Sequence, residues 1–236
     1  MTINGQPNQW IHQIDEQFKE EDLIKAYVKI YTEVGLRHGQ RIGKAANMSQ
    51  KDFNPNFFKE AYERYVAIYL QQSGMARIYD VRSTFVEYIA SVLTGKTYGV
   101  TTPDPSTIAT WLQKMARRRD FYRWQALRIA RTESTAASNL GGVNAIKDSG
   151  YVMDKVWVSS HDGRTRRNPD DWFDHYEMEG KKVAEGEKFE MGSMKGHIDH
   201  LEYPGDPKGH PANTINCRCS LIHRPRKVDG RLVRKR

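Results

Sequence analysis

Cysteine is scarce in this sequence: only two of the 236 residues are cysteines, Cys217 and Cys219, with one residue between them. A disulfide joining them would close a loop too short to stabilise a fold, which excludes a disulfide scaffold. Long apolar runs are also missing, and no stretch approaches the roughly 18 apolar residues of a membrane span. The first residues are polar and lack the apolar segment of a signal peptide. We therefore expect a soluble protein, made in a cytoplasm, with no membrane partner.

Positive charge is concentrated in two segments. The formal net charge of the chain is +8, and residues 111–131 and 224–236 each carry a net charge of +6, so the remainder is mildly acidic. Two basic segments on such a chain indicate contact with nucleic acid or with an acidic protein surface. The alternatives are a solvated helix face in the first segment and a solubilising end in the second. The candidate phosphate-binding residues are Arg117, Arg118, Arg119, Arg224, Arg226, Lys227, Arg231, Arg234, Lys235 and Arg236.

The spacing of apolar residues changes near the middle of the chain. Helical spacing in the first half predicts helices around residues 10–34, 57–69 and 85–93, the second of them with Phe57 and Tyr65 on its buried face. A longer helix is predicted from Phe121 to Lys147. Beyond it, a β-type run around Trp157 and closely spaced glycines and prolines predict short strands and turns.

The expected fold class is therefore α+β. We predict an all-helical amino-terminal half over residues 1–120 and a small domain, consisting of the long helix plus short strands, over residues 121–223. Residues 224–236 contain few apolar side chains, so we expect a flexible basic tail.

Four short motifs follow one another in the second half of the chain. They are Ala130-Arg131-Thr132-Glu133 with Asn139, Trp157 followed by Asp162-Gly163-Arg164-Thr165-Arg166, Tyr203-Pro204-Gly205-Asp206-Pro207, and Asn216-Cys217-Arg218-Cys219. In this order and spacing, the sequence resembles the carboxy-terminal domain of the Mu F-like phage minor head proteins, also called head morphogenesis proteins, over about residues 125–222. The structural motif residues that we match to the family are Arg131, Glu133, Asn139, Asp162, Arg164, Arg166, Asp206 and Asn216, together with both cysteines.

The resemblance implies a structural protein of a tailed bacteriophage head, located in the virion near the portal and made in the host bacterial cytoplasm. The implied partners are the portal protein, the major capsid or scaffold protein, and double-stranded DNA bound without sequence specificity. The histidine that the family places after its Arg-Thr-Arg triplet corresponds here to His175, beyond an inserted-looking segment, 168–174. No catalytic residue is expected, because the motif residues supply no evident nucleophile and base.

Charged motif residues suggest how the domain is held together. Arg131 and Arg166 are placed to donate forked hydrogen bonds to Glu133, Asp162 or Asp206. Such pairs would join the long helix, a loop and the last strand.

The two cysteines offer a metal site or a packed pair of thiols. On a strand, residues i and i+2 project from the same face, so Cys217 and Cys219 would converge and leave Arg218 on the other face. Two thiolates with a histidine are zinc ligands, and His175 is the first candidate, with His161, His210 and His223 as others. A structural zinc ion and two buried reduced thiols both remain open.

Two enzymatic alternatives use other residues. A metal-dependent His-Asn-His nuclease would draw on Asp199-His200, then Asn213 or Asn216, then His223. An ADP-ribosyl transferase would draw on Arg131, Ser159-Ser160 and Glu177-Met178-Glu179. We favour the structural protein over both, with the nuclease as the leading alternative.

Overall fold

The computed structural model describes residues 20–45, 54–71 and 119–235. The helix predicted over residues 85–93 and the candidate phosphate contacts Arg117, Arg118 and Arg236 lie outside these ranges. Among the described helices, none has both the length and the apolar character needed to cross a membrane. The elements are α2 (Glu20–Ile30), the π-helix η1 (Tyr31–Gly35), α3 (Leu36–Ala45), α4 (Pro55–Tyr69), α7 (Arg119–Lys147), β1 (Met153–Val158), β2 (Lys182–Ala184), β3 (Phe189–Gly192), β4 (Ile198–Leu201), α8 (Pro211–Thr214), β5 (Ser220–Pro225), β6 (Lys227–Val228) and β7 (Arg231–Leu232).

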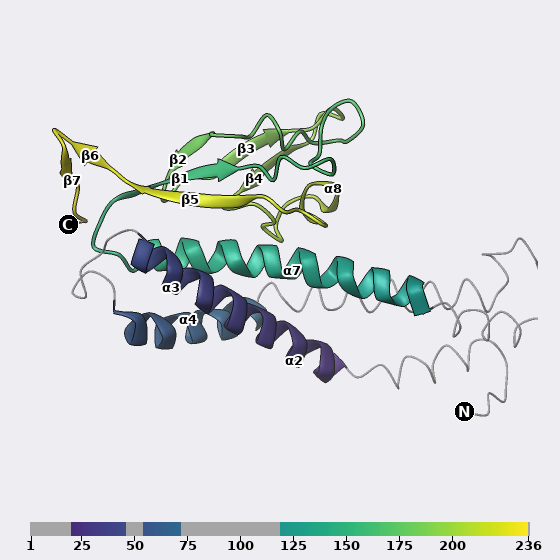
Figure 1. Ribbon diagram of the computed structural model, residues 1–236, viewed down its shortest axis with the longest axis horizontal. Coiled ribbons are helices and arrows are strands. Elements are labelled where there is room, and N and C mark those ends of the chain that lie inside the picture. Colours follow the sequence, from purple (N-terminus) through teal and green to yellow (C-terminus); the bar gives the residue numbers. More distant parts are fainter. Residues whose placement is uncertain (1–19, 46–53, 72–118, 236) are drawn as a thin grey trace, which may run out of the picture. The chain divides into compact units, whose positions relative to one another are not determined.

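Helices come first along the chain and short antiparallel strands follow, so the predicted α+β class is confirmed. Most described residues belong to one compact unit, formed by Tyr27–Leu70 and Leu127–Arg236. Within this unit, α7 has α3 and α4 on one side and the strands on the other (Figure 1). The boundaries predicted at residues 120 and 223 remain predictions, and the observed unit draws residues from both sides of each.

Helix α4 begins where the sequence supplies a cap. The side chain of Asn54 accepts hydrogen bonds from the backbone N–H groups of Asn56 and Phe57 at 3.0 and 3.3 Å, and Pro55 occupies the first turn, where its missing N–H has no cost. The prediction of its buried face was wrong by one residue. Phe58, Tyr62, Val66 and Tyr69 are buried, whereas Phe57 is 61% exposed.

Two overlapping apolar faces explain this error, because both satisfy helical spacing. The face that is buried is the one whose tyrosine reaches the neighbouring helix. The Tyr62 hydroxyl donates a hydrogen bond to the Tyr31 carbonyl at 3.1 Å, and its ring lies against Gly35. The Phe58 ring lies against Gly39 in the same way.

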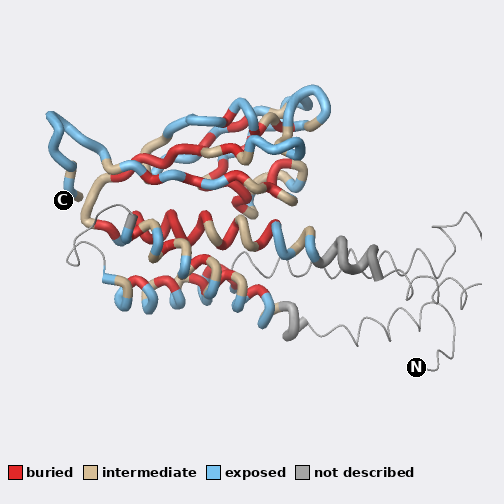
Figure 2. The backbone as a smooth tube through the Cα atoms, in the orientation of Figure 1, coloured by how far each residue is buried: buried red, intermediate tan, exposed pale blue. Residues whose placement is uncertain are grey.

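Helix α7 confirms the long helix predicted from the sequence, and nearly all of its residues from Ala136 to Ile146 are buried (Figure 2). Its glycines allow close approach to the neighbouring helix. A Cβ atom on Gly141 would lie 2.0 Å from the Gly35 carbonyl oxygen. Only glycine permits this backbone contact.

Strand β1 is the central strand of a three-stranded antiparallel sheet in the order β2-β1-β5. The predicted β-type run is therefore confirmed, and its Trp157 is fully buried. β3 and β4 form a separate hairpin. Lys155 on β1 is also fully buried, and its ammonium group donates to the carbonyls of Glu187 and Glu202 at 2.7 and 2.9 Å, which ties the sheet to the loops beside it.

The end of the chain forms a hairpin instead of the flexible tail that its composition suggested. β6 and β7 pair in antiparallel fashion, and the N–H of Val152 donates to the carbonyl of Val233 at 2.9 Å. The ammonium group of Lys235 donates to the carbonyls of Ile146 and Lys147, at the end of α7. Composition did not predict this order because it depends on backbone bonds to residues about 80 positions earlier.

Candidate metal centre

The two cysteines lie in an extended segment between α8 and β5, and the strand itself begins only at Ser220. The prediction of a strand at this point was therefore wrong. Asn216 enters the segment with a φ of 61°, a left-handed conformation that asparagine tolerates better than most residues. Its N–H donates to the Thr132 hydroxyl at 2.8 Å, which fixes the segment to α7.

His175 reaches the cysteines from the loop between β1 and β2. Its backbone N–H donates to the carbonyl of Arg166 at 3.1 Å, and its ring meets the ring of Trp157 edge to face at 5.7 Å between centroids. The side chain is buried, with an exposed fraction of 2%. Loop and strand thus hold the imidazole in one orientation.

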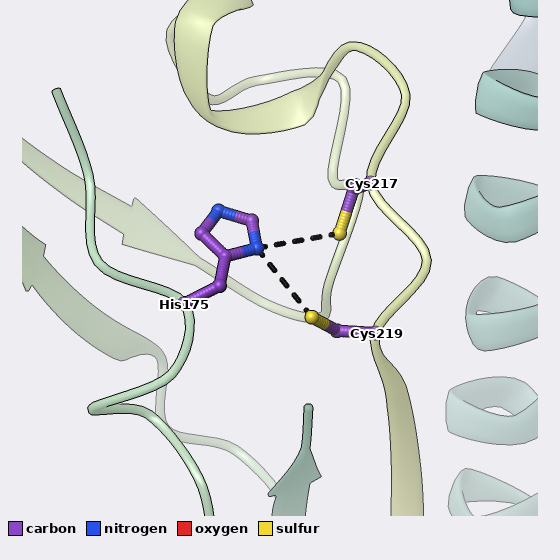
Figure 3. A group of neighbouring side chains, drawn as sticks. All are labelled: His175, Cys217 and Cys219. Carbon is purple, nitrogen blue, oxygen red and sulfur yellow. Dashed lines mark hydrogen bonds between the residues drawn. The ribbon is translucent and has the colours of Figure 1, made fainter. Parts of the chain in front are cut away.

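The three side chains converge on one point (Figure 3). His175 Nδ1 lies 3.4 Å from Cys219 Sγ and 3.7 Å from Cys217 Sγ. All three residues are buried, both cysteines are free thiols, and the three ligand atoms lie within 4.8 Å of one another. Among the described residues, this is the one group of three or more histidine, cysteine or acidic side chains with that geometry.

The other ring nitrogen of His175 faces a buried polar chain. His175 Nε2 lies 2.7 Å from Asn213 Oδ1, and Asn213 Nδ2 lies 2.7 Å from Asp199 Oδ2. Asp199 also accepts hydrogen bonds from the backbone N–H of His210 and from the ring of His197. Asn213 and Asp199 are both buried.

The two sulfurs differ in acidity. A hydrogen bond from the Cys217 thiol lowers the pKa of Cys219 to about 4, and the backbone N–H of Ser160 contributes to the shift. The pKa of Cys217 is raised well above its usual value, first by that same hydrogen bond and then by burial. Cys219 is therefore the more readily ionised of the two sulfurs.

Asn139 connects this region to α7. Its amide group donates to the carbonyls of Pro204 and Cys219 at 2.9 and 3.1 Å and accepts from the N–H of Leu221 at 3.2 Å. Asp206, in the neighbouring turn, accepts from the N–H groups of Glu202 and Lys208. Asn139 thus links three of the four sequence motifs through the backbone groups of Pro204 and Cys219, whereas the hydrogen bonds of Asp206 stay within its own turn.

The expected arginine forks are not formed as predicted. Arg218, to which the sequence motifs gave no role, makes the forked contact to Asp162, and Arg164 lies 3.8 Å from the same carboxylate. Arg166 instead donates to the carbonyl of Ile215. The Arg218 side chain is half-buried, whereas that of Asp162 is exposed.

The remaining two charged motif residues lie on α7. Arg131 is exposed, and the buried Glu133 accepts a hydrogen bond from the Tyr31 hydroxyl at 3.0 Å. Glu133 therefore joins α7 to η1, whereas the sequence suggested a partner in the strand region.

Each enzymatic alternative has one pair of its residues in contact, Asp199 with Asn213 and Ser159 with Glu179. His200 and Asp199 are neighbours on β4, and side chains alternate along the strand, so Asp199 is buried and His200 is exposed. His223 is buried on β5, against Gly142. Ser159 was considered for ADP-ribosyl transfer. Its hydroxyl group donates a hydrogen bond to the carbonyl of His175, and its backbone N–H donates one to the carboxylate of Glu179.

The basic residues at the end of the chain fall into two groups. Arg226 pairs with Asp154, Arg234 lies over the ring of Tyr151, and Lys235 pairs with Glu185. The exposed side chains of Arg224, Lys227 and Arg231 form no ion pair within the described part of the chain. Arg119 is described only as the first residue of α7.

Comparison with known families identifies this arrangement of motifs. The family described as Phage Mu protein F like protein matches residues 105–222, which is half of the chain. The chain belongs to this family. The matched segment of this Mu F-like chain contains the motif residues of α7, the loop that carries His175, and both cysteines. No curated protein and no solved structure matches it.

Membership indicates a role in bacteriophage head morphogenesis and a place in the virion. The resemblance seen in the four motifs is thereby confirmed, and the match begins about 20 residues before the segment expected from them, residues 125–222. Sequence reasoning missed Arg218 as the partner of Asp162. The sequence did single out Asn213 and Asp199, but as residues of the nuclease alternative and not as neighbours of His175.

Proposed function

We propose that this protein is a minor head protein that docks at the portal or on the inner capsid surface and contacts packaged double-stranded DNA. Family membership carries the proposal, because the matching segment contains most of the described strand region and its motif residues. The role is structural and requires no catalysis. The proposed partners are the portal protein and the major capsid or scaffold protein.

The described surface supports the DNA contact. Arg224, Lys227 and Arg231 stand on β5, β6 and β7, and all three are exposed. Cationic side chains with no acidic partner are available to phosphates, and they bind without reading base sequence. Arg226 and Lys235 already pair with carboxylates, so we assign the phosphate contacts to the first three.

Salt dependence tests the DNA contact. The variant R224Q/K227Q/R231Q should bind duplex DNA more weakly, and the slope of log K against log salt should become shallower by about 1 for each phosphate that the variant no longer neutralises. The variant K59Q/K181Q/K188Q removes three exposed charges elsewhere and serves as the control. An unchanged slope in the first variant would contradict the assignment.

Docking is tested on assembled particles. Proheads made with and without portal protein are purified, and the amount of this protein in each is measured by mass spectrometry. Loss from particles that lack a portal supports docking at the portal, whereas equal amounts in both assign docking to the inner capsid surface. Absence from both kinds of particle would overturn the proposal.

A further inference from the structure

The cluster of His175, Cys217 and Cys219 has the spacing of a metal site. A tetrahedral zinc ion with bonds of about 2.1 Å to nitrogen and 2.3 Å to sulfur separates these two ligand atoms by about 3.6 Å. The observed separations of 3.4 and 3.7 Å lie on either side of that value. A thiol packed beside an imidazole requires only one such contact, whereas here one nitrogen faces both sulfurs.

The polar chain behind His175 determines which nitrogen is available. An ionised aspartate only accepts hydrogen bonds, so the Asn213 group that faces Asp199 is the NH2 group. The Asn213 carbonyl oxygen therefore faces His175 and accepts a hydrogen bond from the Nε2–H group. Nδ1 is left without a proton, and its lone pair points toward the two sulfurs.

We propose that His175 Nδ1, Cys217 Sγ and Cys219 Sγ bind a zinc ion, and that Asn213 and Asp199 are positioning residues that hold the imidazole in the ligating tautomer. Thiolate and imidazole ligands select zinc over magnesium or calcium, which prefer oxygen. The fourth position has no protein ligand among the described residues and is assigned to water. This inference does not depend on the proposed role in the phage head.

The ion would join two segments that are distant in sequence. His175 belongs to the loop between β1 and β2, and the cysteines precede β5, more than 40 residues later. Metal binding to such a site stabilises the folded chain, because the unfolded chain does not hold the three ligands together. All three ligands are buried, so the ion would lie inside the folded chain, between the two segments that it joins.

The first test measures metal on the full chain, purified under reducing conditions without chelator. We expect about one zinc per chain by elemental analysis, and cobalt should replace it with intense thiolate-to-cobalt charge-transfer absorption. Cys219→Ser and His175→Ala should lose stoichiometric zinc, whereas His200→Ala, at an exposed histidine, should retain it. Wild-type protein with no zinc, or with cobalt that binds without charge-transfer absorption, would overturn the site even if the ligand variants fail to fold.

The second test concerns the positioning residues. Asn213→Leu should lower zinc affinity by about 10- to 100-fold, measured by competition with a chromophoric chelator, because the imidazole loses its fixed tautomer. At saturating cobalt its spectrum should match that of the wild type, since all three ligands remain. Asn144→Leu removes another buried asparagine, whose amide contacts the Leu140 carbonyl and Tyr65 and none of the three ligands, and serves as the control. Equal affinity for Asn213→Leu and wild type would remove the positioning role.

Discussion

The two sides of α7 are held by different interactions. Toward the helices, Gly141 and Gly35 touch backbone to backbone, and the rings of Phe58 and Tyr62 lie against glycines. Toward the strands, Asn139 makes three hydrogen bonds to backbone groups of two other segments. The helical side of α7 is held by close packing, and the strand side is held by hydrogen bonds. A substitution should therefore be costly for a different reason on each side.

Phe58→Ala should have the largest effect, because it removes a fully buried ring from the helical side. We expect a loss of about 3–5 kcal/mol in the free energy of unfolding, measured by urea denaturation. Phe57→Ala, one position earlier, removes an exposed ring and should change stability by less than about 0.5 kcal/mol. A larger loss for Phe57→Ala than for Phe58→Ala would mean that the buried face of α4 is the one first predicted from the sequence.

Gly141→Ala tests shape on the same side without removing an apolar group. The added methyl group would lie 2.0 Å from the Gly35 carbonyl oxygen, and neither backbone can move independently of its helix. We expect destabilisation of about 3 kcal/mol, the upper end of the range for overpacking.

A glycine in open space provides the comparison. Gly186→Ala adds the same methyl group where no atom lies within 4 Å, and should be nearly neutral in the same urea measurement. If Gly141→Ala were equally neutral, the helices would not be in backbone contact.

Asn139→Ala tests the polar side. It leaves two carbonyls and one N–H without their partner in a buried region, and we expect a loss of about 2 kcal/mol. Asn144→Ala removes one hydrogen bond to the Leu140 carbonyl and a contact with the half-buried Tyr65, and should cost about 1 kcal/mol. Thermal melts of both variants decide the point, and a smaller loss for Asn139→Ala than for Asn144→Ala would contradict it.

The sequence predicted the features that depend on local patterns. The spacing of apolar residues predicted α7, and the run around Trp157 predicted β1. Residue types alone brought Cys217, Cys219 and His175 together as candidates, and the structure places them side by side.

Features that depend on packing were not predicted. Helical spacing fits both faces of α4 equally, so the choice between Phe57 and Phe58 follows from contacts with Gly39. The orientation of the Asn213 amide follows from Asp199, which lies on another segment and has no fixed spacing in the sequence. Similarly, the contact of Arg218 with Asp162 joins residues 56 positions apart.

The two sides of α7 meet at Gly142, where His38 of α3 and His223 of β5 lie against the helix. Neither ring nitrogen of His223 has a hydrogen-bond partner among the described residues. Burial lowers the pKa of His223 to about 3, and the charges of His38 and Lys155 add to the shift. The folded protein therefore holds this histidine neutral under conditions in which the unfolded chain protonates it.

Stability should consequently fall with acidity. Above the ordinary pKa of 6.5 both states are neutral at His223, and the full stability is present. As the pH falls from 6.5 toward about 3, the unfolded chain binds one more proton, and the free energy of unfolding should drop by up to about 1.4 kcal/mol per pH unit. Urea denaturation of the wild type and of His223→Leu across this range measures the difference. As the pH falls, the wild type should lose more stability than His223→Leu, and His200→Leu, at an exposed histidine, should follow the wild type. Parallel curves for the wild type and His223→Leu would show that protonation of His223 does not contribute to the loss of stability.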